Sequence, residues 1–139
     1  MMKIRPFQSE DATAVISLWS VCGLLAPQND PAKDIDRKMQ VNSGGFLVGE
    51  AHGRIIASCM AGYEGHRGWI NYLAVSPEHR RRGVGRQMMA AAEAYLKISG
   101  CPKINLQVRA SNTEVMAFYA ALGFVVDDVV SMGKRLVVD

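Results

Sequence analysis

Apolar residues recur every three or four positions in three stretches of the chain, the spacing of one face of a helix. The first stretch is residues 9–22, with an apolar face of Val15, Leu18, Trp19 and Cys22. The second follows residue 83 and has an apolar face of Val84, Met88, Ala91, Ala92 and Tyr95. The third begins at a cap residue, Asn112, and closes at Gly123. A shorter helix is predicted after Asp30-Pro31, a typical cap and first-turn proline.

Between these helices, apolar runs bounded by turn residues predict strands. We expect them at 3–7, 46–50, 55–63, 69–75 and 104–109, with one or two more in the tail after residue 124. The order is β, α, α, an antiparallel β meander, then α, β, α, β. This order predicts an α/β protein with a mixed sheet and helices on both faces. The length of 139 residues fits a single domain, 1–139.

Composition narrows the functional classes. The net charge of +3 is mildly basic, which suits an anionic ligand but is too weak to indicate nucleic acid. The three cysteines are widely spaced and form no CxxC pair, so we expect reduced thiols, no disulfide frame and no metal site. The chain shows no membrane-spanning apolar run and no signal peptide. These features predict a cytoplasmic protein without a membrane partner.

The stretch RRRGVG, residues 80–85, lies between a predicted strand and a predicted helix. Glycines let the backbone approach a ligand closely, the helix start offers unpaired N–H groups, and arginines match phosphate oxygens. The combination indicates a phosphate cradle. It lacks the Lys-Ser/Thr of a Walker loop and the third glycine of a dinucleotide fingerprint. Two alternatives stay open: a solvated basic helix start, and a patch for a nucleic-acid backbone.

Two longer stretches add a resemblance. LAVSPEHRRRGVG and N-x6-Y-x2-LGF, the latter from Asn112 through Tyr119, resemble the GNAT acetyltransferase superfamily. The cofactor motif of that superfamily, Arg/Gln-x-x-Gly-x-Gly/Ala, corresponds to Arg80, Gly83 and Gly85. NDPAKDIDRKM and SMGKRL are also similar to a bacterial subgroup, the YpeA-type acetyltransferases.

The resemblance implies a mostly antiparallel central sheet, splayed around acetyl-CoA, with helices on both faces. It implies that the loop binds the pyrophosphate and that the pantetheine arm lies along the 69–75 strand like an added strand. An N–H near Leu73 would hold the thioester oxygen, and Tyr119 would be the general acid. The residues expected to bind the cofactor are Leu73, Ala74, Val75, Arg80, Arg81, Arg82, Gly83, Val84, Gly85, Arg86, Asn112 and Tyr119. No metal is expected.

The proton acceptor is expected in the loop before the 69–75 strand, where Glu64 and His66 are candidates; a solvated loop is the alternative reading. The acceptor substrate is expected near Asn29, Asp30 and Tyr72, whereas Asp34 and Asp36 are read as surface charges. Trp19 and Trp69 are expected in the core.

The sequence therefore predicts an acetyl-CoA-dependent N-acetyltransferase that acts on a primary amine by direct transfer, as a monomer or homodimer. Alternatives are a ribosomal-protein-type N-terminal acetyltransferase and a non-catalytic CoA-binding module. In LQVRASN, Gln107 occupies the position where the ribosomal-protein enzymes carry a glutamate, and an amide cannot act as a base. A small nucleic-acid binder is the third class.

Overall fold

The computed structural model describes residues 1–139 and contains a five-stranded sheet in the order β1-β2-β3-β4-β5. Strands β1 (Lys3–Pro6), β2 (Phe46–Ala51), β3 (Arg54–Tyr63) and β4 (Gly68–Val75) pair as an antiparallel meander. The short β5 (Ile104–Asn105) joins β4 in parallel. The predicted mixed sheet is confirmed.

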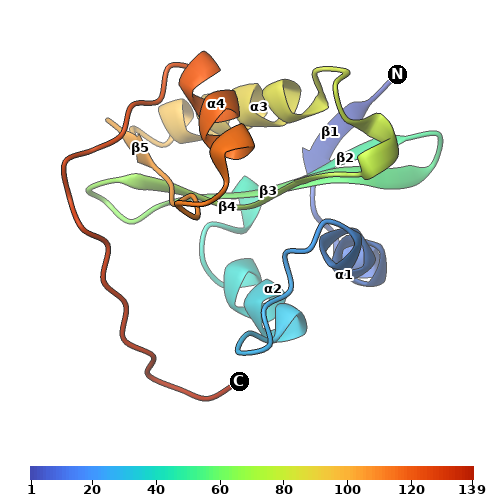
Figure 1. Ribbon diagram of the computed structural model, residues 1–139. Coiled ribbons are helices and arrows are strands. Elements are labelled where there is room, and N and C mark those ends of the chain that lie inside the picture. The colour runs from blue at the N-terminus through green and yellow to red at the C-terminus, as the bar shows by residue number, and fades with distance from the viewer.

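Helices cover both faces of this sheet (Figure 1). One face carries α1 (Ala12–Val21), which follows the 3-10 turn η1 (Ser9–Asp11), and α2 (Pro31–Met39). The other face carries α3 (Val84–Ile98) and α4 (Thr113–Ala121). Two more 3-10 turns, η2 (Ser43–Gly45) and η3 (Pro77–His79), lie in connections. No helix in the chain combines the length and the hydropathy needed to cross a membrane.

The predicted helix caps form as expected. The Asp30 carboxylate accepts hydrogen bonds from the N–H groups of Ala32 (3.0 Å) and Lys33 (3.2 Å) at the start of α2. The Asn112 side chain accepts from Val115 N–H (3.2 Å) at the start of α4. Each cap satisfies N–H groups that have no carbonyl partner within the helix.

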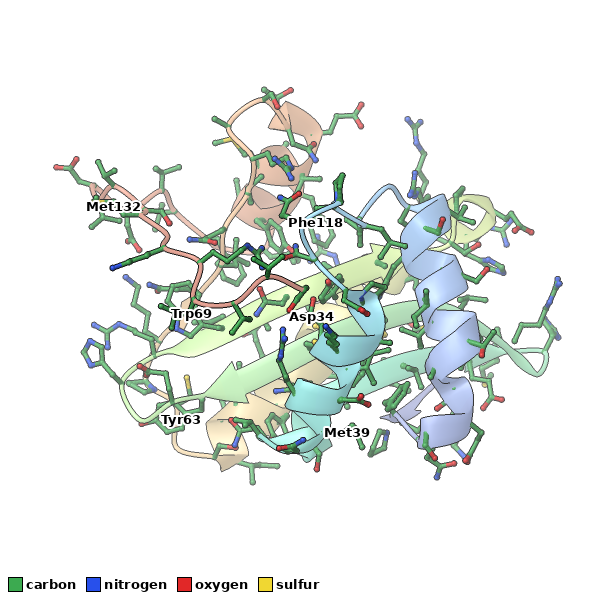
Figure 2. All side chains as sticks on the ribbon, turned by 90° about the horizontal axis from the view of Figure 1, so that it is seen from below. Asp34, Met39, Tyr63, Trp69, Phe118 and Met132 are labelled. Carbon is green, nitrogen blue, oxygen red and sulfur yellow. The ribbon has the colours of Figure 1, made fainter.

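Two apolar cores lie on either side of the sheet. The α1 side contains Val15, Leu18, Trp19, Phe46, Met60 and Ala74, with Trp19 fully buried. The α3 side contains Ala57, Cys59, Ala61, Met88, Ala92, Leu96 and Tyr119. The expectation that Trp69 is a core residue is wrong. Trp69 is 37% exposed, because it lines a wide cleft beside β5 and the tail instead of packing under a helix (Figure 2).

The strands after α3 differ from the expectation. β5 covers two residues, not 104–109, and residues 125–139 form no strand. The valines of the tail come as adjacent pairs, 125–126 and 129–130, so they lack the alternation that gives a strand one apolar face. Polar side chains hold the tail instead, through Lys103–Asp127 (3.1 Å) and Arg37–Asp139 (2.7 Å). The tail therefore runs from α4 past the sheet and ends beside α2 (Figure 1).

Candidate active site

The central feature of the site is a bulge in β4. Ser58 pairs with Ala74 and Met60 pairs with Asn71, so β4 has one residue more than β3 in this interval. Tyr72 and Leu73 thus both lie opposite Cys59, and Tyr72 adopts a left-handed backbone (φ +52°). A β-bulge turns part of the strand out of the ladder and re-aims its side chains.

The bulge changes which face the side chains of β4 occupy. Ile70 packs in the α3-side core, and without a bulge Tyr72 would follow it there. Tyr72 packs instead on the α1 side, where its ring stacks on Trp19 with centroids 3.8 Å apart. Leu73 and Val75 pack on the α3 side, and Ala74 is buried on the α1 side. The extra residue therefore turns Tyr72 toward the α1 side of the sheet and leaves Leu73 on the α3 side.

The outer edge of β4 is open beyond its first two residues. β4 pairs with β5 over Gly68–Trp69 only, and the ladder then ends. Ser76 N–H donates to Ile56 O (2.8 Å), so the next pair, Val75 with Ala57, is the non-hydrogen-bonded type. The backbone groups of Val75 therefore point away from β3, along the edge where an extended ligand can add.

The RRRGVG turn leads directly from this edge into α3. Arg80 folds back so that its Nε donates to Val75 O (3.2 Å), and Arg81 has a left-handed backbone (φ +64°). Gly83, also left-handed (φ +77°), is the N-cap of α3 and offers no capping side chain. The first α-helical bond of α3 runs from Gln87 N–H to Gly83 O (3.0 Å), so the preceding N–H groups have no partner in the helix.

The arginines of the turn are free of carboxylate partners. All ion pairs of the chain use Arg5, Arg37 or Lys103. Arg80, Arg81, Arg82 and Arg86 are solvent-exposed. Four guanidinium groups without carboxylate partners, at the N-terminus of a 15-residue helix, create a positive potential that would attract an anion.

Helix α4 lies against this helix start. A side chain at Gly85 would meet Phe118 at 3.1 Å, so the glycine permits the close approach of α4 to α3. Tyr119, the next residue, is 8% exposed and packs edge-on against Phe118 and Phe124, with centroids at 5.0 and 5.5 Å. Burial raises the pKa of its phenol above the ordinary value, so the hydroxyl stays protonated at neutral pH. Tyr119 shares the α3-side core with Cys59, the residue opposite the bulge.

The predicted acceptor residues lie on the opposite face. The Tyr72 hydroxyl donates to Asp34 Oδ2 (2.7 Å), which brings β4 and α2 together beside the tail (Figure 2). Burial and the hydrogen bond to Asp34 raise the pKa of Tyr72. Asn29 accepts from Arg135 (2.7 Å), and Asp30 caps α2. Asp34 is thus a half-buried partner of Tyr72 rather than a plain surface charge, whereas Asp36 is exposed as expected.

Glu64 and His66 lie in the exposed loop between β3 and β4. The Glu64 carboxylate accepts backbone hydrogen bonds from Arg67 and His66, which lower its pKa. Four residues of β4 separate this end of the strand from the bulge, about 13 Å at the rise of an extended strand. The structure thus brings Leu73, Tyr119 and the RRRGVG turn into one region and leaves Glu64 outside it.

A wide cleft of about 1370 Å³ opens between β5, α4 and the tail. Its lining is mostly apolar and includes Trp69, Leu106, Val108, Tyr119, Phe124 and Val130. Tyr119 lines this cleft, whereas no residue of the RRRGVG turn does.

Sequence reasoning missed three polar residues near the site. Ser58 and Asp34 bond to Tyr72, and Lys38 donates to Ala61 O (2.6 Å) from a half-buried position that lowers its pKa. Ser58 is a polar position inside the apolar run IIASCMA, and that interruption was the available signal. For Asp34 and Lys38 the sequence shows an ordinary charged helix, and their partners come from strands far along the chain.

The chain is similar in sequence to known acetyltransferases. A model described as the acetyltransferase (GNAT) family matches residues 12–124. A protein of Yersinia pestis strain Pestoides F, named acetyltransferase, is 45% identical over 138 residues, 99% of this chain and 98% of that protein.

Solved structures match with the same architecture. The aminoglycoside N-acetyltransferase AAC(6')-Iy, in complex with a CoA bisubstrate analogue, has a TM-score of 0.80 at 22% identity, covering 98% of this chain and 99% of that one. The ribosomal-protein-S18-alanine N-acetyltransferase of Escherichia coli has a TM-score of 0.75 at 21% identity, covering 88% of this chain and 77% of that one. At these identities the two structures support the shared fold.

Proposed function

The chain belongs to the acetyltransferase (GNAT) family, and from this premise we propose that it transfers the acetyl group of acetyl-CoA directly to a primary amine. Membership of the family makes the protein an N-acetyltransferase. The donor, the acceptor and the roles of individual residues are the proposal. The observation that carries it is an uncapped α3 N-terminus with unpaired arginines, placed beside the open edge of β4.

The donor half of the site uses the α3 face. Arg81, Arg82 and Arg86 and the backbone N–H groups from Gly83 to Gly85 hold the pyrophosphate, and Val84 anchors the helix start in the core. The edge of β4 from Leu73 through Ala74 to Val75 bonds the pantetheine amides as an added strand would. Arg80 already bonds the Val75 carbonyl and aligns this edge with the turn. Asn112, the α4 cap, supports the helix that closes the site.

Acetyl-CoA supplies an activated acyl group when bound. The residues of this chain stabilise the charge that develops in the reaction and donate and accept the protons. The Leu73 N–H faces the thioester oxygen and stabilises the negative charge that develops there as the amine attacks. Tyr119 donates its phenolic proton to the sulfur as the carbon–sulfur bond breaks. Glu64, or His66 beside it, accepts the amine proton through a chain of water molecules, because the loop that holds them lies too far from the bulge for direct contact.

The acceptor half uses the α1–α2 face. A cationic amine is drawn there by Asp34 and by Asp30, and Tyr72 and Asn29 offer hydrogen-bonding groups to the rest of the acceptor. We propose a cytoplasmic location for the protein, supported by its three free thiols. Gln107 is exposed and bonds Ser131, so it offers no carboxylate where the ribosomal-protein enzymes have one.

Calorimetric titration with acetyl-CoA tests the donor assignment. We expect binding with a dissociation constant on the order of micromolar, which corresponds to about −8 kcal/mol. Gly83→Asp should weaken binding about tenfold or more, because it adds a negative charge where the pyrophosphate lies. Gly83→Asn is the matched control: it has the same size and tolerates the left-handed backbone, and it should weaken binding less than about threefold.

Two outcomes would contradict the proposal. Absence of binding at millimolar acetyl-CoA would remove the donor site and leave a basic helix start. Equal weakening by the two substitutions would show that Gly83 matters only for the backbone. Thiol release on addition of amines then separates an enzyme from a CoA-binding module that lacks catalysis.

A further inference from the structure

A fully buried hydroxyl lies beside the bulge. Ser58, on β3, accepts a hydrogen bond from Trp19 Nε1 (2.8 Å) and donates to Tyr72 O (2.8 Å). The Trp19 ring stacks on the Tyr72 ring at 3.8 Å. α1, β3 and β4 each contribute one member of this network. Every polar group in it is satisfied, which in a buried position makes the arrangement rigid.

The network fixes the orientation of one peptide unit. The Tyr72 carbonyl and the Leu73 N–H belong to the same peptide, which is planar and trans, so they point in opposite directions. Ser58 binds the carbonyl on the α1 side, together with Trp19. The Leu73 N–H therefore points to the α3 side, the side on which Tyr119 is buried.

The left-handed backbone of Tyr72 makes this support necessary. A non-glycine residue with φ +52° is unfavourable by itself and persists only where its surroundings hold it. The freed carbonyl of a bulge also needs a donor when it is buried. Ser58 supplies this donor, because its hydroxyl donates to the Tyr72 carbonyl and so helps to hold the Tyr72 backbone. The Ser58 oxygen in turn accepts the Trp19 N–H, which fixes the direction of the hydroxyl.

We propose that Ser58 is a positioning residue that aims and polarises the Leu73 N–H toward the thioester oxygen, with Trp19 holding the Ser58 hydroxyl in the productive rotamer. This inference rests on the proposed function, because it takes the Leu73 N–H as the group that binds the thioester oxygen. A hydrogen bond to the carbonyl strengthens the N–H of the same peptide as a donor. A preorganised donor of this kind costs no rearrangement during the reaction.

The test compares acetyl-CoA with CoA by ¹H–¹⁵N NMR of the whole protein. The two ligands share the pyrophosphate and the pantetheine arm and differ only at the sulfur, which carries an acetyl group in one and a hydrogen in the other. A difference between the Leu73 amide proton shifts in the two complexes therefore reports the acetyl end of the ligand. In the wild type we expect a further downfield displacement with acetyl-CoA. Ser58→Ala should lose most of this difference, while the dissociation constant for acetyl-CoA, set mainly by the arginine-rich turn, changes less than about threefold.

Matched variants separate aiming from packing. Ser58→Thr keeps the hydroxyl and should keep the difference in Leu73 amide proton shift between the acetyl-CoA and CoA complexes. Trp19→Phe keeps the stacked ring but removes the N–H donor, and should lose part of it. Leu96→Val truncates a side chain that is 1% exposed on α3, away from the bulge, and should leave the difference intact. Urea unfolding of each variant records how much stability it has lost.

The outcomes are distinct. A folded Ser58→Ala protein that binds acetyl-CoA and keeps the full Leu73 difference overturns the proposal, as does an equal loss in Leu96→Val. If Ser58→Ala does not fold, Ser58→Cys replaces it with a weak donor of similar size, and an unchanged difference there is equally decisive. Failure of the wild type to bind acetyl-CoA refutes the donor assignment itself, whereas binding without a wild-type difference refutes only the role of Leu73 and Ser58.

Discussion

At the scale of single residues, Tyr119 places a phenolic hydroxyl in an apolar core. Its ring packs between Phe118 and Phe124, and burial raises its pKa. A raised pKa shifts ionisation above the ordinary value near ~10, so the proton-donating form persists through the alkaline range in which amines become neutral. The raised pKa makes the phenol a weaker acid than a thiol, whose ordinary pKa is near ~8.5, so acidity alone does not drive the proton to the departing thiolate. The transfer therefore depends on the hydroxyl being held close to the sulfur as the carbon–sulfur bond breaks.

Tyr119→Phe removes the hydroxyl and keeps the ring packing. We expect turnover to fall about a hundredfold, the usual contribution of a positioned general acid, with affinity for acetyl-CoA changed less than about threefold. Steady-state thiol release and calorimetry measure the two quantities. Tyr95→Phe, which removes a phenol packed against Gly44, is the control and should leave both unchanged. Unreduced turnover in Tyr119→Phe would exclude Tyr119 from proton transfer.

The hydrogen-bond partners of some polar residues could be predicted from the sequence, and those of others could not. Asp30 and Asn112 were predictable as caps because the N–H groups they bind lie within three residues. The partners of Ser58 are Trp19 and Tyr72, 39 and 14 residues away, and Asp34 is 38 residues from Tyr72. Such pairings depend on the sheet register and on the bulge in β4. Neither can be predicted from the pattern of neighbouring residues in the sequence.

At the scale of elements, Arg5 joins β1 to the turn before α1. Its guanidinium binds Asp11 through both terminal nitrogens (2.8 and 2.9 Å) and also contacts Glu50 on β2 (3.3 Å). The hydrogen bonds from Arg5 lower the pKa of Asp11, whose side chain is largely buried. A lowered folded-state pKa means that the stabilisation is present above the ordinary pKa near ~3.9 and is lost as the pH falls through the folded value.

Asp11→Asn should therefore destabilise the protein in a pH-dependent way. At pH 7 we expect a loss of about 1–2 kcal/mol in the free energy of unfolding, typical of a charge-assisted pair. The gap to the wild type should narrow as the pH falls below about 4, because Asp11 of the unfolded wild-type chain then takes up a proton, and it should close once the pH falls through the lower folded-state pKa. Urea unfolding across pH 2–7 measures this. Glu10→Gln, an exposed neighbour, is the control; a constant gap over the range would contradict the assignment.

The predictable elements were those whose apolar pattern is local. The faces of α1 and α3 and the consecutive strands β2, β3 and β4 were located to within about two residues. The 104–109 strand and the tail strands were not, because a strand at a sheet edge exists only where a neighbour pairs with it. β4 stops pairing after Trp69, and Leu106 onwards lacks that neighbour.

At the scale of the whole molecule, the tail connects the two faces of the sheet. It leaves α4 on one side and ends at α2 on the other, with Met132 92% exposed on the way (Figure 2). The last residue, Asp139, binds Arg37 (2.7 Å) and accepts from Asp30 N–H (3.3 Å). These contacts lower the pKa of Asp139 to about 2, so the attachment is complete at neutral pH and is lost as the pH falls from about 4 through 2.

Asp139→Asn should loosen the end of the tail without unfolding the domain. We expect trypsin to cleave after Lys134 and Arg135 about threefold faster, because local opening of the segment becomes more frequent. Mass spectrometry of the released peptides measures the rate. Asp128→Asn changes an exposed carboxylate of the same tail that has no ion-pair partner, and should leave cleavage unchanged. Equal rates in both variants would show that the Arg37 contact does not hold the tail.

The sheet is the single layer shared by the two halves of the site. On the assignments proposed above, α3 and α4 serve the donor, and α1 and α2 serve the acceptor, with the β4 bulge between them. Substitutions that accumulate on α1 and α2 can then alter which amine is accepted while the donor half keeps working. A duplicated gene with this partition has an evolutionary route to a new substrate, because each step along it retains an enzyme that still binds its donor.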